Sequence, residues 1–377
     1  MITSMDDYLI HQTTEPIAHP EPTDRNFYDR YWMNGYDLSG DFLFECGLGV
    51  YPNRRVMDAH WSVSVGGVQH CFHGSRRAPY DRTESTIGPL TLEVVDPMRK
   101  LRVRLAENET GLSCDLVFTA RSTPHQEPKN VLFDELRCVM NTSRFTQMGR
   151  WSGWFAVGGD RVDLHPDRTL GTRDKSWGVR PIGEPEVAAP ARSNQGPGVY
   201  WVWSPIAWDD GTTTQFGTFE DHDGRPTQLS AHRLPLYDNP AEIPRPEDEV
   251  VTEMAEARHA IEWEKGTRRP SGAAFEFMTK EGQVERFRFE PFARFQMLAL
   301  GYQHPDWAHG VWKGEEEIAG ESWPLDEISP LDYKNIHVHH VGRAVSESGL
   351  SGFGTLETLC FGRHAPSGFD SILDGAP

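Results

Sequence analysis

The sequence has few cysteines, few basic residues and no long apolar run. Its cysteines are scattered, with no C-x-x-C pair, which argues against a disulfide framework or a cysteine-based zinc site. No stretch approaches the roughly 20 apolar residues of a membrane-spanning helix. The first twelve residues lack the apolar segment of a secretory signal. We therefore expect a cytoplasmic protein with no membrane span.

Basic residues are outnumbered by acidic ones. The chain has 377 residues, with 37 Lys and Arg against 56 Asp and Glu, and a formal net charge of −19. Such an excess disfavours nucleic acid and anionic membrane surfaces as partners. The length allows two domains with cores large enough to fold without a disulfide or metal. The oligomeric state is left open.

The motifs that hold common cofactors are missing. The chain has no G-x-x-x-x-G-K-[ST] loop, no dinucleotide fingerprint after a strand, no G-x-S-x-G and no H-E-x-x-H. We therefore expect no cofactor, and a small organic molecule as the substrate.

Turn formers and aromatic residues are abundant, with 35 glycines, 27 prolines and 12 tryptophans. This composition is typical of short strands joined by tight turns. Glycine-containing turns at residues 66–67, 158–159 and 209–211 separate alternating segments, which indicates hairpins. The sequence predicts an all-β protein with two antiparallel barrels or sandwiches in tandem and few short helices. A single large sandwich is the alternative.

The strand rhythm divides the chain into three parts. We expect an N-terminal arm over residues 1–30, a first β-domain over 31–190 and a second over 191–377. A Pro- and Gly-containing stretch at 181–198 is the predicted linker. The apolar residues within 126–141 predict a short helix.

The densest polar and aromatic cluster surrounds Asp174. On an extended strand, Arg173, Lys175 and Trp177 share one face and Asp174 lies on the other. A carboxylate in such surroundings can serve as an acid or base of tuned pKa. Nearby cations, including Arg180, would lower that pKa, which suits a base or an orienting group better than an acid. Alternatively, Asp174 and Arg180 form a structural ion pair.

An aromatic strand follows this cluster. Trp201 and Trp203 share one face, where they fill a core or line a pocket for an apolar ligand. Glu220, on the next hairpin, is either a second carboxylate of the site or a solvated strand end.

Histidines gather at two places near the C-terminus. His304, Asp306 and His309 surround a proline turn, where they could bind a metal, hold the turn or transfer protons. His337 and His339 share one face of a strand, a spacing compatible with two metal ligands. Because no third ligand is defined, we predict no metal site.

Glu357 lies in an apolar strand segment, between Leu356 and Leu359. Facing inward, its carboxylate would be costly to bury and would need a partner. Facing outward, it would be an ordinary surface residue.

Several of these segments together resemble a known group of proteins. RDKSWG at 173–178, YWVW at 200–203, DDG at 209–211 and FGTFEDHDG at 216–224 resemble the carotenoid 1,2-hydratase and AttH-like superfamily. The match is best over residues 170–225. This resemblance implies two lipocalin-like β-barrels in tandem and a cofactor-free site for an apolar ligand.

Only part of the hydratase signature carries over to this chain. Asp174, Trp177 and Gly178 match it, and Glu220 is a looser match to a later acidic position. Lys175 stands where the hydratases have a histidine. This departure argues against carotenoid hydration itself. The segments 301–310 and 354–369 resemble a poorly characterised branch of the same superfamily.

The residues and the resemblance together favour a cofactor-independent hydratase, lyase or isomerase. Its substrate would be an apolar unsaturated molecule, terpenoid, steroid-like or aromatic, in a pocket near the domain junction. An acid would protonate the substrate, tryptophan rings would stabilise a cation, and a base would activate water or remove a proton. The expected catalytic residues are Asp174, His304, His309 and Glu357. The expected substrate contacts are Arg173, Trp177, Arg180, Trp201, Trp203 and Glu220.

Two other functions remain open. A binding protein for hydrophobic ligands would need only aromatic residues and one polar anchor. A metal-dependent enzyme would use His304, His309 and the histidines of 337–340.

Overall fold

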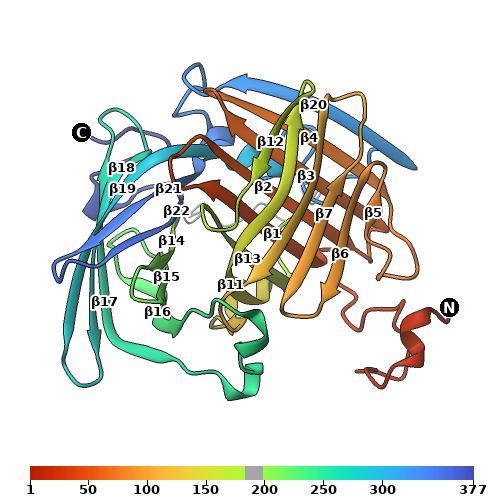
Figure 1. Cartoon of the computed structure of the whole chain (residues 1–377), viewed down its shortest axis with the longest axis horizontal. Helices are drawn as coiled ribbons and strands as arrows, with labels where there is room; N and C mark the ends of the chain where they lie inside the picture. The colour runs from red at the N-terminus through yellow and green to blue at the C-terminus, as the bar shows by residue number, and fades with distance from the viewer. Residues whose placement is uncertain (183–197) are drawn as a thin grey trace.

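Strands joined by tight turns make up most of the chain. The computed structural model describes residues 1–182 and 198–377. Its strands form one large sheet and one closed barrel, which lie side by side (Figure 1). The predicted all-β class, with two antiparallel barrels or sandwiches in tandem, is confirmed. The predicted linker lies outside the described residues except at its two ends.

The large sheet has 14 strands and curls around its own core. Its order is β20-β4-β3-β2-β1-β13-β11-β8-β7-β6-β5, with β9, β10 and β12 paired to β11. The strands are β1 (Phe27–Asp37), β2 (Phe42–Tyr51), β3 (Val56–Val65), β4 (Val68–Arg77), β5 (Thr86–Ile87), β6 (Leu90–Asp96), β7 (Lys100–Leu105), β8 (Leu112–Ala120), β9 (His125–Gln126), β10 (Asn130–Asp134), β11 (Arg137–Val157), β12 (Asp160–Leu164), β13 (Thr169–Val179) and β20 (Glu316–Pro324). Although β20 comes late in the sequence, it pairs with β4.

The closed barrel consists of the remaining strands. They are β14 (Val199–Trp208), β15 (Thr212–Glu220), β16 (Pro226–Pro235), β17 (Thr252–Trp263), β18 (Pro270–Thr279), β19 (Val284–Gln296), β21 (His337–Ser346) and β22 (Ser351–Phe361). The helices of residues 1–182 and 198–377 are short 3-10 turns, η1 (Ser4–Asp7), η2 (Pro240–Glu242), η3 (Pro246–Asp248), η4 (Met297–Leu300), η5 (Tyr333–Asn335) and η6 (Ala365–Ser367). In the described ranges, no helix has the length and apolar character needed to cross a bilayer.

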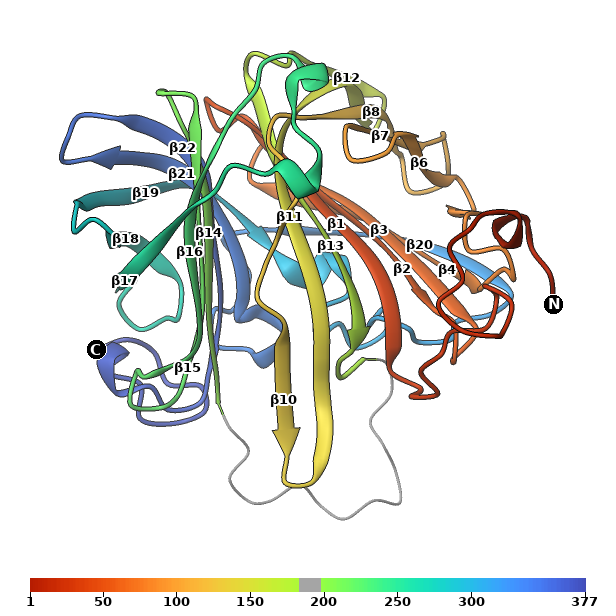
Figure 2. The same ribbon diagram turned by 90° about the horizontal axis from the view of Figure 1, so that it is seen from below.

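The helix predicted over residues 126–141 is wrong, because this segment forms β9, β10 and the start of β11. Glu135 adopts a positive φ of 52° and turns the chain back on itself. The apolar residues that suggested a helical face pack against no core, and Leu136 at the tip is 99% exposed. The hairpin projects from the body of the molecule (Figure 2). The pairing partner of β10 is β11, which continues directly into the sheet.

The three larger buried layers follow from the alternation of side chains along the strands. The first, with Trp61 and Phe118, fills the inside of the large sheet. The second, with Phe275 and Phe287, fills the closed barrel. The third lies between the two bodies and contains Trp32, Trp201, Trp203, Phe295 and other residues. We call this third layer the junction.

Candidate functional site

One side of the junction is a row of neighbouring side chains on the large sheet. Thr146 of β11, Asp174 of β13 and Trp32 of β1 stand opposite one another in antiparallel pairs. Directly opposed residues share a face of a sheet. The Trp32 ring lies 5.0 Å from the His339 ring and 5.6 Å from the Trp203 ring, both on the barrel. The row therefore faces the barrel.

The other side of the junction is a matching row on the barrel. Trp203, Glu357 and His339 are cross-strand neighbours on β14, β22 and β21. His339 lies between two carboxylates, with its Nδ1 2.7 Å from Oε1 of Glu45 and its Nε2 3.1 Å from Oε2 of Glu357. His337 adds a third contact, because its Nε2 is 2.6 Å from Oε1 of Glu357. Glu45 comes from β2, so residues from both halves of the chain meet here.

Charges in this row shift the pKa values of its members. Burial opposes the charge on His339, but Glu45 and Glu357 outweigh it and raise the pKa of His339 to about 10. Burial alone would raise the pKa of Glu357, yet the two histidines hold it well below its usual range. Burial raises the pKa of Glu45 against the pull of His339. We assign the shared proton to His339, because Glu357 also favours the imidazolium.

The pKa of Asp174 is shifted in the opposite direction from the pKa of Glu357. Burial raises the pKa of Asp174 to about 6, with Arg144 opposing the rise and Glu127 adding to it. The Asp174 Oδ2 lies 4.0 Å from Nη1 of Arg144, whose guanidinium is held by hydrogen bonds to Glu127. Thr146 also donates a hydrogen bond to Glu127. The cation beside Asp174 is therefore Arg144.

Two of the cations expected around Asp174, Arg173 and Lys175, lie on the other face of β13, as the alternation of the strand predicts. Nε of Arg173 donates to Oε1 of Gln147 at 2.8 Å, inside the large sheet. Lys175 pairs with Asp29, and Trp177 is 38% exposed. The structure thus brings neither Arg173 nor Trp177 to the junction.

Trp201 and Trp203 do lie at the junction, but protein groups already contact their rings. The Arg144 guanidinium is 5.0 Å from the Trp201 ring and 5.7 Å from the Trp203 ring. The Trp203 ring is also parallel to the imidazole of His339 at 6.1 Å, and Phe219 packs on Trp201 at 4.4 Å. Trp203 is therefore flanked by two cations.

His304 holds a turn away from the junction. Its Nδ1 accepts hydrogen bonds from the backbone N–H groups of Asp306 and Trp307, at 3.1 and 2.9 Å. A neutral imidazole that accepts at Nδ1 carries its proton on Nε2, and this nitrogen lies 3.5 Å from Oε2 of Glu321. The structure therefore matches the turn-holding alternative for this histidine.

His304 also belongs to a group of side chains whose ligand atoms lie close enough together to hold a metal ion. One ligand atom each from His73, His304 and Glu321 lies within 4.8 Å of the others. A metal ligand must offer an unprotonated nitrogen, but the two backbone donors at Nδ1 leave the proton on Nε2. The group therefore does not fit a metal without breaking the turn, and we place none there.

His309 and Arg180 form a layer behind the barrel row. Nδ1 of His309 is 3.2 Å from Nη2 of Arg180, and its Nε2 is 2.6 Å from the carbonyl oxygen of Leu300. The Tyr302 ring lies 4.5 Å from the His309 ring and 4.7 Å from the His337 ring. Tyr302 thus connects these two predicted residues to His337 beside the junction row. Arg180 also forms no ion pair with Asp174 in the described structure.

Glu220 lies elsewhere, at the end of β15 on the barrel side. Its carboxylate contacts His259 and His364. Of the four predicted catalytic residues, only Asp174 and Glu357 are in the junction rows.

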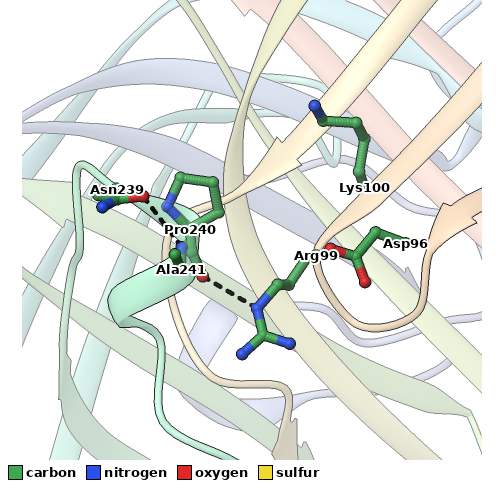
Figure 3. Close-up of a pocket in the computed structure, with 6 residues that line it drawn as sticks. All are labelled: Asp96, Arg99, Lys100, Asn239, Pro240 and Ala241. Carbon is green, nitrogen blue, oxygen red and sulfur yellow. Dashed lines mark hydrogen bonds between the residues drawn. The ribbon is translucent and has the colours of Figure 1, made fainter.

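Solvent reaches both junction carboxylates, because 15% of the Asp174 side chain and 13% of the Glu357 side chain are exposed. A cavity of about 350 Å³ lies elsewhere, next to the β6–β7 turn (Figure 3). In it, Nε of Arg99 donates to the carbonyl oxygen of Pro240 at 3.0 Å. Its lining residues, Asp96, Arg99, Lys100, Asn239, Pro240 and Ala241, include none from the junction. The apolar pocket expected near the junction stays a prediction.

The sequence reasoning missed five junction residues, which are Glu45, Trp32, Thr146, Arg144 and Glu127. Glu45 lies within β2, whose residues are all buried, and an acidic residue in such a run is the same signal that pointed to Glu357. Trp32 carried no comparable signal. Glu127 lies in the predicted helix over 126–141, whereas Arg144 and Thr146 lie in the part of β11 directly after it, where no strand is predicted.

Comparisons with solved structures show a shared architecture at low sequence identity. Kievitone hydratase from Nectria haematococca is 11% identical, with 88% of each chain covered and a TM-score of 0.50. An AttH-like protein from Nitrosomonas europaea is 11% identical, with 88% of this chain and 92% of that chain covered and a TM-score of 0.49. CghA bound to Sch210972 is 10% identical, with 89% of each chain covered and a TM-score of 0.46. The likeness to kievitone hydratase shows the fold alone.

Comparisons of sequence give a family. A search of curated proteins finds no match. Residues 2–370 match a family model described as a family of unknown function, DUF8625. Because the match extends over almost the whole sequence, the chain belongs to the DUF8625 family.

Proposed function

We propose that the junction is the active site of a cofactor-independent hydratase, lyase or isomerase that moves protons on an apolar unsaturated molecule. One observation carries this proposal. Asp174 and Glu357 stand in the two junction rows, and their pKa values are shifted in opposite directions. Two carboxyl groups whose surroundings separate their pKa values are the usual basis of paired acid and base roles.

Asp174 is the proton donor in this proposal. A pKa of about 6 keeps a fraction of the carboxyl protonated near neutral pH and allows it to regain a proton after each turnover. Glu357 stays ionised between His337 and His339. It orients water or receives a proton from the substrate.

The charges beside Trp203 indicate which substrates suit the site. Arg144 and the protonated His339 flank this ring, and like charges so close would disfavour a substrate cation. The same two groups favour negative charge that develops in the transition state. In place of a substrate cation on the tryptophan rings, we therefore propose an enolate-like transition state. The substrate class becomes unsaturated molecules with a carbonyl group conjugated to the double bond.

The two other functions receive less support. A binding protein needs aromatic residues and one polar anchor, whereas this junction buries several ionisable groups from both halves of the chain at a cost in desolvation. A metal-dependent enzyme would need the histidines as ligands. However, the Nε2 atoms of His337 and His339 face Glu357, and His304 holds a turn.

The test offers a panel of terpenoid, steroid-like and aromatic enones to the protein in H₂¹⁸O and in D₂O, with mass spectrometry of the products. Binding is followed separately by the fluorescence of the junction tryptophans. We expect solvent label to enter a substrate, and Asp174→Asn and Glu357→Gln to reduce turnover by about 10²-fold or more while binding is retained.

The control for this test is Asp160→Asn, at an exposed turn of the large sheet, which should keep full turnover. Full turnover in Asp174→Asn would remove this residue from the mechanism. Loss of turnover, binding and folding together would give it a structural role instead.

A further inference from the structure

The closed barrel holds a second polar cluster, separate from the junction. Tyr200, Glu220, His259 and His364 come from β14, β15, β17 and the start of η6. Each of their side chains is at least nine-tenths buried. They lie beside a core in which phenylalanine is the commonest residue. Burying four polar groups is costly unless each has partners, so the contacts within the cluster decide what it can do.

Glu220 is the centre of the cluster. Its Oε2 is 3.2 Å from Nε2 of His364, and its Oε1 is 3.5 Å from Nδ1 of His259. The hydroxyl of Tyr200 is 3.2 Å from Nε2 of His259. The Tyr200 ring also stacks on His364, with ring centres 3.7 Å apart. The imidazole of His364 is therefore fixed both in position and in orientation.

A serine extends this cluster toward the surface. Oγ of Ser367 is 2.8 Å from Nδ1 of His364. A carboxylate only accepts hydrogen bonds, so Nε2 of a neutral His364 carries the proton and donates it to Glu220. Nδ1 then keeps a lone pair, and the Ser367 hydroxyl must donate to it. This is the protonation pattern of a serine activated by a histidine base and an orienting carboxylate.

The surrounding turn presents Ser367 outward. η6 ends at Gly368, which adopts a left-handed conformation with φ 71°. The N–H of Ala365 donates to the carbonyl oxygen of His222 at 2.9 Å, which ties the turn to the β15–β16 connection beneath the barrel (Figure 2). Ser367 is half-buried, whereas the side chain of Pro366 is exposed. Ser367 is therefore partly open to solvent.

We propose that Ser367, His364 and Glu220 form a second site, in which Ser367 attacks small uncharged esters. The Ser367 oxygen bonds to the ester carbonyl carbon while its proton passes to Nδ1 of His364. The alcohol leaves as the C–O ester bond breaks, and it takes that proton. Water then attacks the acyl-serine by the same route and releases the carboxylic acid and the free hydroxyl. An uncharged donor is chosen because the Glu220 carboxylate lies directly behind the base and repels anions.

The test uses the full-length protein and an alkyl fluorophosphonate, which forms a covalent bond with activated serines. Peptide mass spectrometry locates the label, and p-nitrophenyl acetate hydrolysis gives a second reading. We expect labelling at Ser367 that disappears in Ser367→Ala. His364→Gln should slow labelling by about 10²-fold or more, and Glu220→Gln should slow it by a smaller factor. Ser348→Ala, at the exposed β21–β22 turn, should have no effect.

A second measurement does not depend on the folding of the His364 variant. In Ser367→Cys, the thiol should react with iodoacetamide at least 10-fold faster than the thiol of Ser348→Cys, because His364 accepts its proton. Equal rates would overturn the proposal. The absence of label at Ser367, or labelling that is unchanged in a folded His364→Gln protein, would overturn it as well and would leave His364 as a residue that only holds the turn.

Discussion

The two faces of β14 show how one strand contributes to two different environments. Tyr200 and Val202 face the interior of the barrel, where most neighbours are apolar and come from the barrel itself. Trp201 and Trp203 face the junction, where Arg144 and His339 contact their rings. Side chains on both faces are buried. Burial alone therefore does not mark the site, whereas charged groups converging from both halves of the chain do.

The largest loss of stability is expected for substitution of His339, because its buried charge distinguishes the junction most clearly from the barrel core. His339→Leu would leave Glu45 and Glu357 buried without the cation between them. We expect the free energy of unfolding to fall by about 3–5 kcal/mol, measured by urea denaturation. On the other face, Phe287→Leu in the barrel core should cost only about 1–2 kcal/mol. Equal costs for the two variants would mean that His339 acts as an ordinary core residue.

A smaller effect should appear in the pH dependence of stability. Since the pKa of Asp174 is about 6 in the folded protein and about 4 in an unfolded chain, the folded state binds more protons between these values. Stability from this group is therefore lost as the pH rises from 4 to 6, by about 2–3 kcal/mol. Asp174→Asn cannot titrate. Its stability relative to the wild type should rise over this interval in urea denaturation, and parallel curves would contradict the shift.

Arg144 supplies the cation beside Asp174. Arg144→Met removes the charge that opposes the raised pKa of Asp174. We expect that pKa to rise by roughly one further unit, as measured by ¹³C NMR of labelled aspartate. A fall, or no change, would mean that Arg144 is too far from the carboxyl to influence it.

The smallest effect is expected on the opposite face of β13. Lys175→Met breaks an ion pair with Asp29 near the surface. Such pairs contribute roughly 0–1 kcal/mol, so the free energy of unfolding should change by less than about 1 kcal/mol. The titration of Asp174 should stay the same. A clear shift in that titration would show that the two faces of the strand are electrostatically coupled.

Local patterns in the sequence predict the strands and part of the site. The glycine turns predict the hairpins. An acidic residue in an apolar strand draws attention to Glu357, whose carboxylate contacts two histidines in the structure. The alternation of β13 also separates Asp174 from Arg173 and Lys175. The helix expected over 126–141 fails because the apolar spacing there does not distinguish a helix from an exposed hairpin.

Local patterns do not predict which distant segments of the chain pack together. Asp174 and Glu357 are brought to facing rows by the packing of two separate β-structures, which no local spacing encodes. The same holds for the pairing of β20 with β4 and for the contact of Glu45 with His339. His337 and His339 do share a face, as expected. Both contact the carboxylate of Glu357. This shared partner explains their spacing without a metal.

The most direct test of the active-site proposal is a ¹³C NMR titration of the Asp174 and Glu357 side-chain carboxyl carbons, assigned with the Asp174→Asn and Glu357→Gln variants. We expect Asp174 to titrate near pH 6 and Glu357 to stay ionised well below the range of ordinary glutamates. Titration of both groups near pH 4 would contradict the paired acid and base roles.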